Sequence, residues 1–333
     1  MNKLIFKLFC SKAILTLIAL LLAIILASCT GMTTQAVKEM PNEINENPEV
    51  YFCPRDDCGK MLESQITKAN LSVYCALYDI DLRNMINALS KKSENADVRV
   101  VMDNSNYEEQ IKGDGLRLDD EQVMHNKFCV IDSNTVITGS FNPTDNDNNR
   151  NNNNIVVIYS RALASNYKDE FNELWNGEFG KGNNVKNPVL YVNKIKIENY
   201  FCPEDTCAAH VIDQIKNAKS SVYFMAFSFT NEKIADELIK KENADIRGIF
   251  DAQQSSSQFS QLKRLKEFGI NAKNDSNKYK MHHKVFIIDN QTVVTGSFNP
   301  TLSGDTKNDE NLLVIHDKKI ANAFLEEFDK LWQ

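Results

Sequence analysis

One stretch of sequence occurs twice in this chain and constrains both its fold and its chemistry. Residues 124–144 have the sequence MHNKFCVIDSNTVITGSFNPT, and residues 281–301 have the sequence MHHKVFIIDNQTVVTGSFNPT. The two copies hold His, Lys, Asp, Gly, Ser and Asn at the same internal spacing. The chain is therefore expected to contain two similar halves, each supplying half of one site.

The repeat extends to both sides of these stretches. Residues 50–58 and 199–207 each contain Tyr-Phe-Cys-Pro followed by a second cysteine. Amphipathic patterns predict helices at residues 61–69, 82–92, 211–218 and 231–241, and β-rich runs predict strands at residues 71–78, 95–103, 221–229 and 243–251. A final helix pattern in each half ends at Trp175 and Trp332. This alternation predicts an α/β fold of two tandem α/β/α domains related by a pseudo-twofold axis.

The predicted domains span residues 49–178 and 188–333. A segment rich in Gly and Asn, residues 176–187, is expected to link them. The first half is shorter before its histidine, and it is expected to lack an amphipathic helix near residues 259–268. Residues 29–48 are polar and hold two prolines, which predicts a flexible tether.

The N-terminus has the pattern of an export signal over residues 1–28. Lys3, Lys7 and Lys12 precede the apolar run of residues 13–27, and small residues follow. The sequence Leu-Ala-Ser-Cys ending at Cys29 is similar to the lipobox of bacterial lipoproteins, which predicts lipidation of Cys29. An uncleaved membrane anchor is the alternative. Both predict an exported protein attached to a membrane surface.

Charge narrows the classes of partner. The 333 residues are 42% hydrophobic, enough for a sizeable core, and carry a formal charge of −7. The predicted signal segment holds three of the 38 bases and none of the 45 acids, so the remainder has 35 bases against 45 acids, a charge of −10. Phosphate neutralisation dominates duplex nucleic-acid binding, so this balance disfavours a general duplex binder.

The repeated stretch predicts phosphoryl chemistry. Residues two apart on a strand share a face, so His125 projects with Lys127 and His282 with Lys284. Each Gly-Ser-Phe-Asn turn adds a hydroxyl and an amide, from the four residues Ser140, Asn142, Ser297 and Asn299. A nucleophilic or proton-donating imidazole, a fixed cation and polar donors suit an anionic transition state. Asp132 and Asp289 fall on the opposite strand face and are expected to be structural.

These residues resemble the paired His-x-Lys-x(4)-Asp and Gly-Ser-x-Asn signature of the phospholipase D superfamily, and most closely its small bacterial endonuclease and mitochondrial cardiolipin-hydrolase branch. The resemblance implies a phosphodiesterase that needs no metal or other cofactor and forms a covalent phosphohistidine. It further implies that Lys127, Lys284, Asn142 and Asn299 hold the phosphate, with Ser140 and Ser297 in support. That branch usually joins two identical chains, so this chain is expected to be a monomer with an internal pseudo-dimer.

One position departs from this branch. Its members often carry an acid at a fixed spacing after the histidine, which orients an imidazole. Glu310 has this spacing from His282, but Asn153 occupies the same position relative to His125 in the first half. An amide cannot stabilise an imidazolium as a carboxylate does, so the two histidines are expected to titrate differently. By analogy with fused members, His125 is assigned as the nucleophile and His282 as the acid and base.

Three functions are compatible with these features. Membrane attachment favours phospholipids as the substrate, whereas the motif spacing favours a surface endonuclease. The third function is not enzymatic: an inactive phosphate-binding surface module. The presence of every motif residue in both halves argues against it.

The remaining cysteines, histidines and tryptophans receive structural interpretations. Local disulfides Cys53–Cys58 and Cys202–Cys207 are favoured over zinc ligation because exported chains favour disulfides. Cys75 and Cys129 replace Phe224 and Phe286 of the other half and are expected to be small buried apolar residues. Solvated or structural roles are expected for His210, His283 and His316, and core packing for Trp175 and Trp332.

Overall fold

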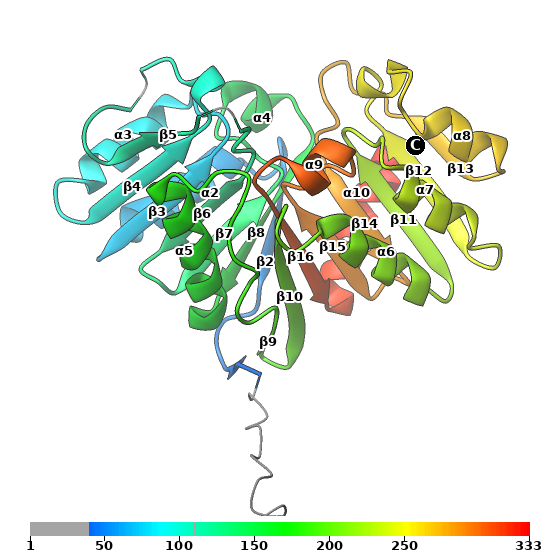
Figure 1. Cartoon of the computed structure of the whole chain (residues 1–333), viewed down its shortest axis with the longest axis horizontal. Coiled ribbons are helices and arrows are strands. Elements are labelled where there is room, and N and C mark those ends of the chain that lie inside the picture. Colours follow the sequence, from blue (N-terminus) through cyan, green and yellow to red (C-terminus); the bar gives the residue numbers. More distant parts are fainter. Residues whose placement is uncertain (1–39, 110, 121) are drawn as a thin grey trace, which may run out of the picture. The chain divides into compact units, whose positions relative to one another are not determined.

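The computed structural model describes residues 40–109, 111–120 and 122–333, and a compact unit runs from Met40 to Gln333 (Figure 1). The predicted signal segment (residues 1–28), the predicted lipidation site Cys29 and the first part of the predicted tether lie outside the described residues. Among the described residues, no helix combines the length and the hydropathy that a bilayer span requires.

The first half forms a seven-stranded sheet in the order β2-β8-β7-β6-β3-β4-β5. Its strands are β2 (Glu49–Cys53), β3 (Ser72–Leu77), β4 (Asp97–Met102), β5 (Leu116–Leu118), β6 (Lys127–Ile131), β7 (Thr135–Gly139) and β8 (Asn153–Tyr159). β3, β4 and β5 run parallel to one another, and β2, β6, β7 and β8 pair antiparallel with their neighbours.

The second half repeats this order as β10-β16-β15-β14-β11-β12-β13, with β9 and β1 added beside β10. Its strands are β9 (Val189–Val192), β10 (Ile195–Cys202), β11 (Ser221–Ala226), β12 (Asp245–Phe250), β13 (Asn271–Asn274), β14 (Lys284–Ile288), β15 (Thr292–Gly296) and β16 (Glu310–His316). The short β1 (Asn42–Glu43) pairs with β9, so this part of the predicted tether belongs to the folded unit.

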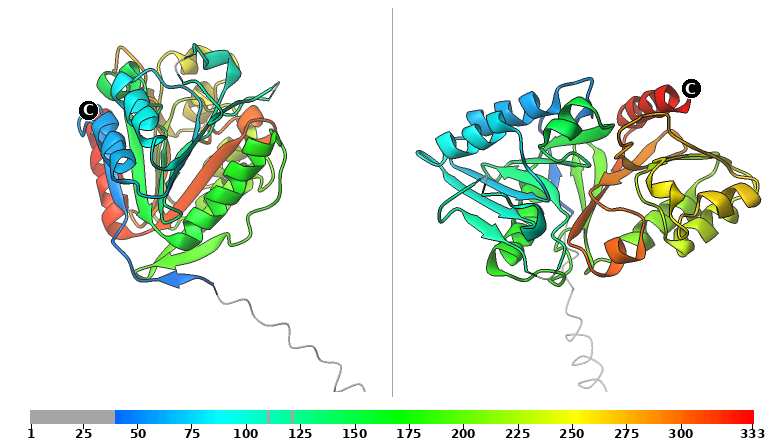
Figure 2. Two further views of the ribbon diagram at one scale, coloured as in Figure 1. Left: turned by 90° about the vertical axis from the view of Figure 1, so that its left-hand side faces the viewer. Right: turned by 90° about the horizontal axis from the view of Figure 1, so that it is seen from above.

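Helices cover both faces of each sheet (Figure 2). α2 (Cys58–Lys68) and α3 (Arg83–Lys92) pack on one face of the first sheet, and α5 (Arg161–Asn176) packs on the other. In the second half α6 (Cys207–Asn217), α7 (Glu232–Ile239) and α8 (Leu262–Glu267) lie opposite α10 (Lys318–Trp332). The predicted fold of two repeated α/β/α domains is confirmed, and α8 is the helix that the first half lacks.

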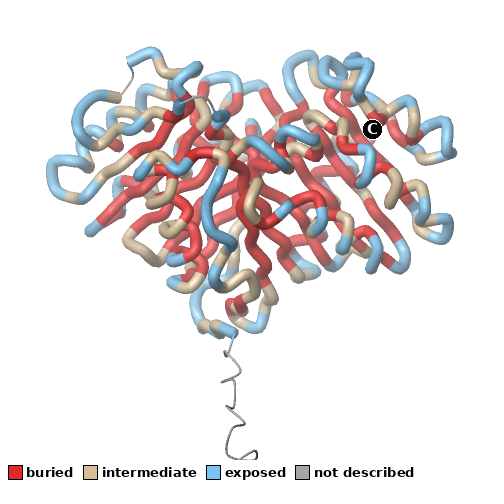
Figure 3. The backbone as a smooth tube through the Cα atoms, viewed as in Figure 1, coloured by how far each residue is buried: buried red, intermediate tan, exposed pale blue. Residues whose placement is uncertain are grey.

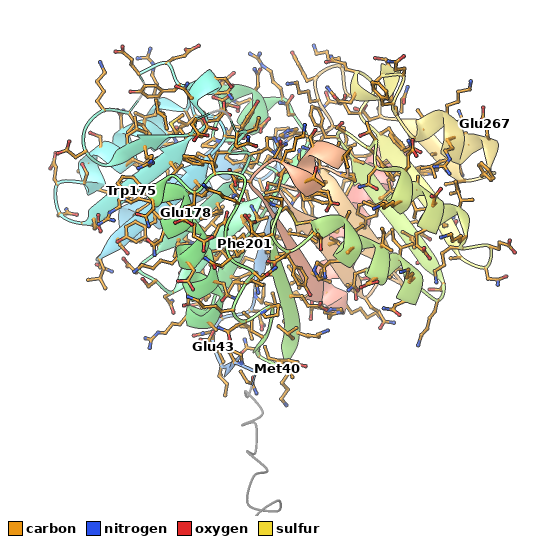
Figure 4. The ribbon with its side chains drawn as sticks, viewed as in Figure 1. Met40, Glu43, Trp175, Glu178, Phe201 and Glu267 are labelled. Atoms are coloured by element: carbon orange, nitrogen blue, oxygen red, sulfur yellow. A yellow bond between two sulfur atoms is a disulfide. The ribbon has the colours of Figure 1, made fainter. Side chains whose placement is uncertain are left out.

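The largest buried cluster crosses the boundary between the halves. It contains strand residues of both sheets together with the inner faces of α5 and α10. The ring of Tyr167 on α5 lies 4.9 Å from that of Phe201 on β10, which Figure 4 labels near the middle of the unit. Buried strands run through both halves, with exposed segments at the periphery (Figure 3). The two halves therefore share a core.

Three disulfides are formed among the described residues. Cys53–Cys58 and Cys202–Cys207 are bonded as predicted. Cys75 and Cys129 are buried as predicted, but the prediction that they are separate apolar residues was wrong, because they form a third disulfide. They lie opposite each other on β3 and β6, with their Cα atoms 4.1 Å apart. At the same register Phe224 lies opposite Phe286, so a disulfide replaces an aromatic pair.

Asp132 and Asp289 are structural, as predicted. The Asp132 carboxylate accepts hydrogen bonds from the backbone N–H groups of residues 70, 71 and 72 at 2.7–2.9 Å. Asp289 accepts from the N–H groups of residues 219, 220 and 221. Each carboxylate thus fixes the start of the central parallel strand, β3 or β11.

Asp309, at the boundary between the halves, is a buried carboxyl whose charge affects stability. It is 2% exposed; its Oδ1 accepts a 2.7 Å hydrogen bond from Gly180 N, and its Oδ2 has no partner within the described residues. Burial, with the charges of Glu204 and Asp119, raises the pKa of Asp309 to about 8.

Because the folded-state pKa lies above the unfolded value, Asp309 opposes folding increasingly as the pH rises from about 4 to about 8. Asp309→Asn is expected to increase the unfolding free energy at pH 8 by about 1 kcal/mol or more and to change it little at pH 4.5. Urea unfolding at both pH values measures this, with the exposed Asp213→Asn as the control. Equal effects at both pH values would contradict the raised pKa.

Candidate active site

Two main-chain hydrogen bonds place each histidine beside the opposite half. His125 N donates to Asp309 O at 3.0 Å, and His282 N donates to Asn152 O at 2.9 Å. Asp309 and Asn152 immediately precede β16 and β8, so the first residue of each of these strands faces the histidine of the other half. Both motif copies therefore meet at one site, as the repeat predicted.

Glu310, the first residue of β16, holds the imidazole of His125. Both carboxylate oxygens lie 2.9 Å from His125 Nδ1, and Glu310 is fully buried. The acid that the spacing identified in the second half thus serves the histidine of the first half. The contact fixes the ring and leaves Nε2 as the nitrogen that can meet a substrate.

His282 has a different pair of partners. Its Nδ1 lies 2.8 Å from Asn153 Oδ1 and 3.5 Å from an oxygen of the buried Asp147. Asp147 lies on the short helix α4 (Asp145–Asn149), and Gly304 occupies the equivalent position on α9 (Leu302–Thr306). Asn153 stands where the other half has Glu310, so it offers His282 an amide in place of a carboxylate. Asp147 supplies the carboxylate beside His282 instead.

The two lysines are buried beside their histidines. Lys127 Nζ donates to His125 O at 2.7 Å and lies 4.8 Å from the ring centre of Tyr78. Lys284 Nζ donates to His282 O at 2.8 Å and lies 4.9 Å from the ring centre of Phe227. Burial lowers the pKa of Lys127 to about 8, and burial and the charge of Lys127 lower that of Lys284 well below its usual value.

The same forces act on the imidazoles. Burial lowers the pKa of His125, with Glu310 opposing this effect. Burial, then the charge of Lys284, lower the pKa of His282 to about 3, and Asp147 opposes them. Both rings are therefore neutral at neutral pH. Within the described residues, neither Nε2 forms a hydrogen bond.

Glycine is required in both Gly-Ser turns because the next strand comes very close. A Cβ at Gly139 would lie 2.2 Å from Asn154 O, and one at Gly296 would lie 2.3 Å from Asn311 O. The following serines are fully buried. Ser140 Oγ accepts from Asn154 N at 3.1 Å, and Ser297 Oγ accepts from Asn311 N at 2.9 Å. The serines therefore fasten the turns to β8 and β16.

The two motif asparagines are held unequally. Asn142 donates to the Asp147 carboxylate through its backbone N–H at 2.8 Å and through its side chain at 3.0 Å. Asn299 has no carboxylate at the equivalent position, because Gly304 stands there in place of Asp147. In the described part of the chain, Oδ1 of each asparagine is buried without a partner.

The other histidines and the tryptophans have structural contacts. His283 is fully buried with its Nδ1 3.1 Å from Asn154 Oδ1, His316 Nε2 lies 2.7 Å from Glu198, and His210 Nε2 lies 3.0 Å from Asp205 O. Trp175 and Trp332 stack on Phe171 and Phe328 of their own helices and pack against the shared core. Figure 4 labels Trp175 on the first half.

The site joins two imidazoles, whose Nε2 atoms form no hydrogen bond among the described residues, with two buried lysines and flanking amides. These features define a class of protein: a duplicated α/β fold with one composite site suited to an anionic phosphoryl group. The family model described as "Cardiolipin synthase, PLD-like domain" matches residues 62–175 and 211–332, more than half of the chain. The chain belongs to the phospholipase D superfamily.

Two similar proteins each match about two fifths of this chain. A protein named phospholipase D from Rickettsia prowazekii is 32% identical over 143 residues, covering 41% of this chain and 68% of its own length. A mitochondrial cardiolipin hydrolase from Chlamydomonas reinhardtii is 33% identical over 129 residues, covering 38% of this chain and 58% of its own length.

A solved structure covers both halves. The phosphatidylserine synthase of Haemophilus influenzae covers 85% of this chain and 85% of its own, with a TM-score of 0.66 and 13% sequence identity. At this identity the likeness concerns the fold alone. The shared fold extends over both halves of this chain.

The contacts between halves predict opposite changes in the two histidines. Glu310→Gln removes a negative charge from His125 and is expected to lower its pKa. Asn153→Glu adds a negative charge beside His282 and is expected to raise its pKa by about one unit or more. Histidine NMR titration measures both. The exposed Asp145→Asn, on the same helix as Asp147, should change neither; if Glu310→Gln left His125 unchanged, the pairing would be wrong.

Proposed function

We propose that this protein hydrolyses phosphodiester bonds of phospholipids, without a metal ion, through a covalent phosphohistidine on His125. The observation that carries the proposal is the His125–Glu310 contact, which fixes the neutral imidazole of His125. Within the described residues, Nε2 of this ring forms no hydrogen bond and can meet a substrate. Glu310 would stabilise the positive charge that the ring gains when Nε2 bonds to phosphorus.

In the first step Nε2 of His125 attacks phosphorus, and the bond from phosphorus to the leaving alcohol breaks. His282 gives its proton to the leaving oxygen. Burial, and then the charge of Lys284, lower the pKa of His282. A bound phosphate would offset the repulsion by Lys284, so we infer that His282 takes up its proton together with the substrate. Lys127, Lys284, Asn142 and Asn299 hold the phosphate oxygens.

In the second step water attacks the phosphorus of the intermediate and His282 takes a proton from it. The phosphorus–nitrogen bond breaks, which restores neutral His125 and releases the phosphate monoester. His282 thus acts as an acid and then as a base, and both steps require residues of both halves.

Two considerations support a phospholipid over the alternatives. Relatives of this chain are named phospholipase D and cardiolipin hydrolase. The acidic remainder of the chain, at −10, offers no general attraction for a polyanion. A metal-independent surface endonuclease is the second candidate because the motif spacing suits it. An inactive phosphate-binding module is opposed by the orientation of both imidazoles.

We also propose the cellular setting, which depends on residues outside the described ones. Residues 1–28 act as an export signal, and Cys29 is lipidated, or the apolar segment remains as an anchor. The enzyme then faces outward at a membrane, as a monomer with domains over residues 49–178 and 188–333.

The covalent step can be isolated with an activated substrate. 4-Nitrophenolate leaves without protonation, so His282→Asn is expected to release one equivalent from bis(4-nitrophenyl) phosphate in EDTA and then stall as phosphorylated His125. Stopped-flow absorbance and mass spectrometry measure the burst and the adduct. His125→Asn should give no burst. A burst from His125→Asn instead would reverse the two roles, and activity lost in EDTA but restored by zinc would contradict the mechanism.

One assay separates the two candidate substrates. The purified full chain, in detergent and EDTA, receives mixed phospholipid vesicles and, separately, plasmid and single-stranded DNA. Phosphatidic acid with intact DNA is the expected result. Degraded DNA with intact lipid would establish the nuclease, and that activity should fall steeply with salt. The double variant His125→Ala, His282→Ala should lose all turnover; full function in it would revive the binding module.

A further inference from the structure

A patch of cations and aromatic rings borders His282, and we call its five residues the His282 patch. These residues are Phe227, Arg150, Lys278, Tyr279 and Lys280. Lys278 Nζ lies 5.0 Å and the Arg150 guanidinium 5.5 Å from the ring centre of Tyr279. Three of the five side chains are therefore cationic, and they surround two aromatic rings.

The patch is continuous with the catalytic residues. The ring of Phe227 lies 4.6 Å from that of His282, and Lys280 Nζ lies 5.8 Å from the ring centre of Phe227. Lys280 O accepts a hydrogen bond from Asn152 N, and Asn152 O accepts one from His282 N. Lys280 therefore lies close enough to His282 to contact a substrate bound there.

The cations of the patch are available to a ligand. Lys278, Tyr279 and Lys280 are exposed. Among the ion pairs of residues 40–109, 111–120 and 122–333, none involves Lys278 or Lys280. Arg150 is 3.4 Å from the exposed Asp145. In a chain with ten more acids than bases after the predicted signal segment, three neighbouring cations with one carboxylate partner form a local anion-binding surface.

The opposite side of the site is different. Gln122 and Val123 occupy the positions of Tyr279 and Lys280, and the equivalence is structural, because Val123 O accepts from Asp309 N as Lys280 O accepts from Asn152 N. Val123 is 40% exposed. On that side Lys307 stands at the position of Arg150. The His125 side thus offers an exposed apolar residue where the His282 side offers a cation.

This asymmetry favours a lipid over a nucleic acid. A nucleic-acid strand carries phosphates on both sides of the scissile bond, and proteins that bind it line the whole path with cations. A phospholipid carries acyl chains on one side of its phosphodiester and a head group on the other. A side with Val123 in place of a lysine, facing a side with three cations, matches the second arrangement better.

We propose that the His282 patch is a binding site for an anionic group on the leaving alcohol, so that the preferred substrates are phospholipids with a further phosphate in the head group. The inference rests on the proposed function, in which His282 protonates the leaving oxygen and the head group therefore lies on its side. Head groups with a positive charge, such as choline, are repelled by the same lysines.

A matched pair of soluble lipids tests this. Dihexanoyl phosphatidylinositol and its 4-phosphate differ by one phosphate in the leaving alcohol. The wild-type protein is expected to have a kcat/KM about tenfold higher for the 4-phosphate, and Lys278→Gln with Lys280→Gln should bring this ratio close to one. Lys307→Gln, on the opposite side, is the control and should preserve it. A ratio near one in the wild-type protein would overturn the proposal.

Binding of the released alcohol separates this inference from the proposed function. Inositol 4-phosphate is expected to bind the wild-type protein at least about tenfold more tightly than inositol does, by calorimetry, and the lysine double variant should lose this difference. If the protein hydrolyses phospholipids but binds inositol 4-phosphate no more tightly than inositol, the proposed role of the His282 patch is wrong and the proposed function stands. If inositol 4-phosphate binds more tightly than inositol but no phospholipid is hydrolysed, the proposed function is wrong and the role of the patch stands. Cleavage of single-stranded DNA, weakened by the same double variant, would replace the lipid with a nucleic acid.

Discussion

The hydrogen bond from each histidine backbone to the opposite half is the contact on which the site depends. His125 N and His282 N each donate to the residue that precedes the last strand of the other half. Such a bond fixes the histidine and the start of that strand in one register, so that Glu310 meets His125 and Asn153 meets His282. The same hydrogen bonds therefore set the catalytic geometry and join the two halves. The core that α5 and α10 share adds apolar contacts between the halves.

Within this symmetric frame the carboxylates are distributed asymmetrically. His125 receives its carboxylate from β16 of the second half, whereas the nearest carboxylate to His282 comes from α4 of the first half. Asp147 cannot have a counterpart without movement, because a Cβ at Gly304 would lie 2.5 Å from Asn299 O. The same carboxylate restrains Asn142 and leaves Asn299 without an equivalent. Unequal support of the imidazoles is the arrangement expected where one attacks and the other transfers a proton.

Sequence reasoning succeeded where the repeat itself carried the information. Spacing identified both motif copies, the α/β/α order and the acid at Glu310, because these depend on local pattern and on comparison of the halves. It missed Asp147, because an acid within an asparagine-rich segment has no periodic signal and its partner, His282, belongs to the other half of the chain. It missed the Cys75–Cys129 bond because Phe224 and Phe286 indicate only that those positions are apolar. Strand register, which places the two cysteines opposite each other, comes from sheet pairing rather than from composition.

Joining the halves in one chain explains how the two sides of the site can differ. In a dimer of identical chains, a lysine beside one histidine would appear beside the other, and both sides would carry the same charge. In this chain Lys280 and Val123 occupy equivalent positions with different chemistry, as do Asp147 and Gly304. The difference between Lys280 and Val123 changes the surface beside the phosphodiester. The difference between Asp147 and Gly304 changes which imidazole has a carboxylate from the short helix beside it. A fused pair can thus distinguish the two sides of a phosphodiester, which a symmetric pair must treat alike until the substrate itself breaks the symmetry.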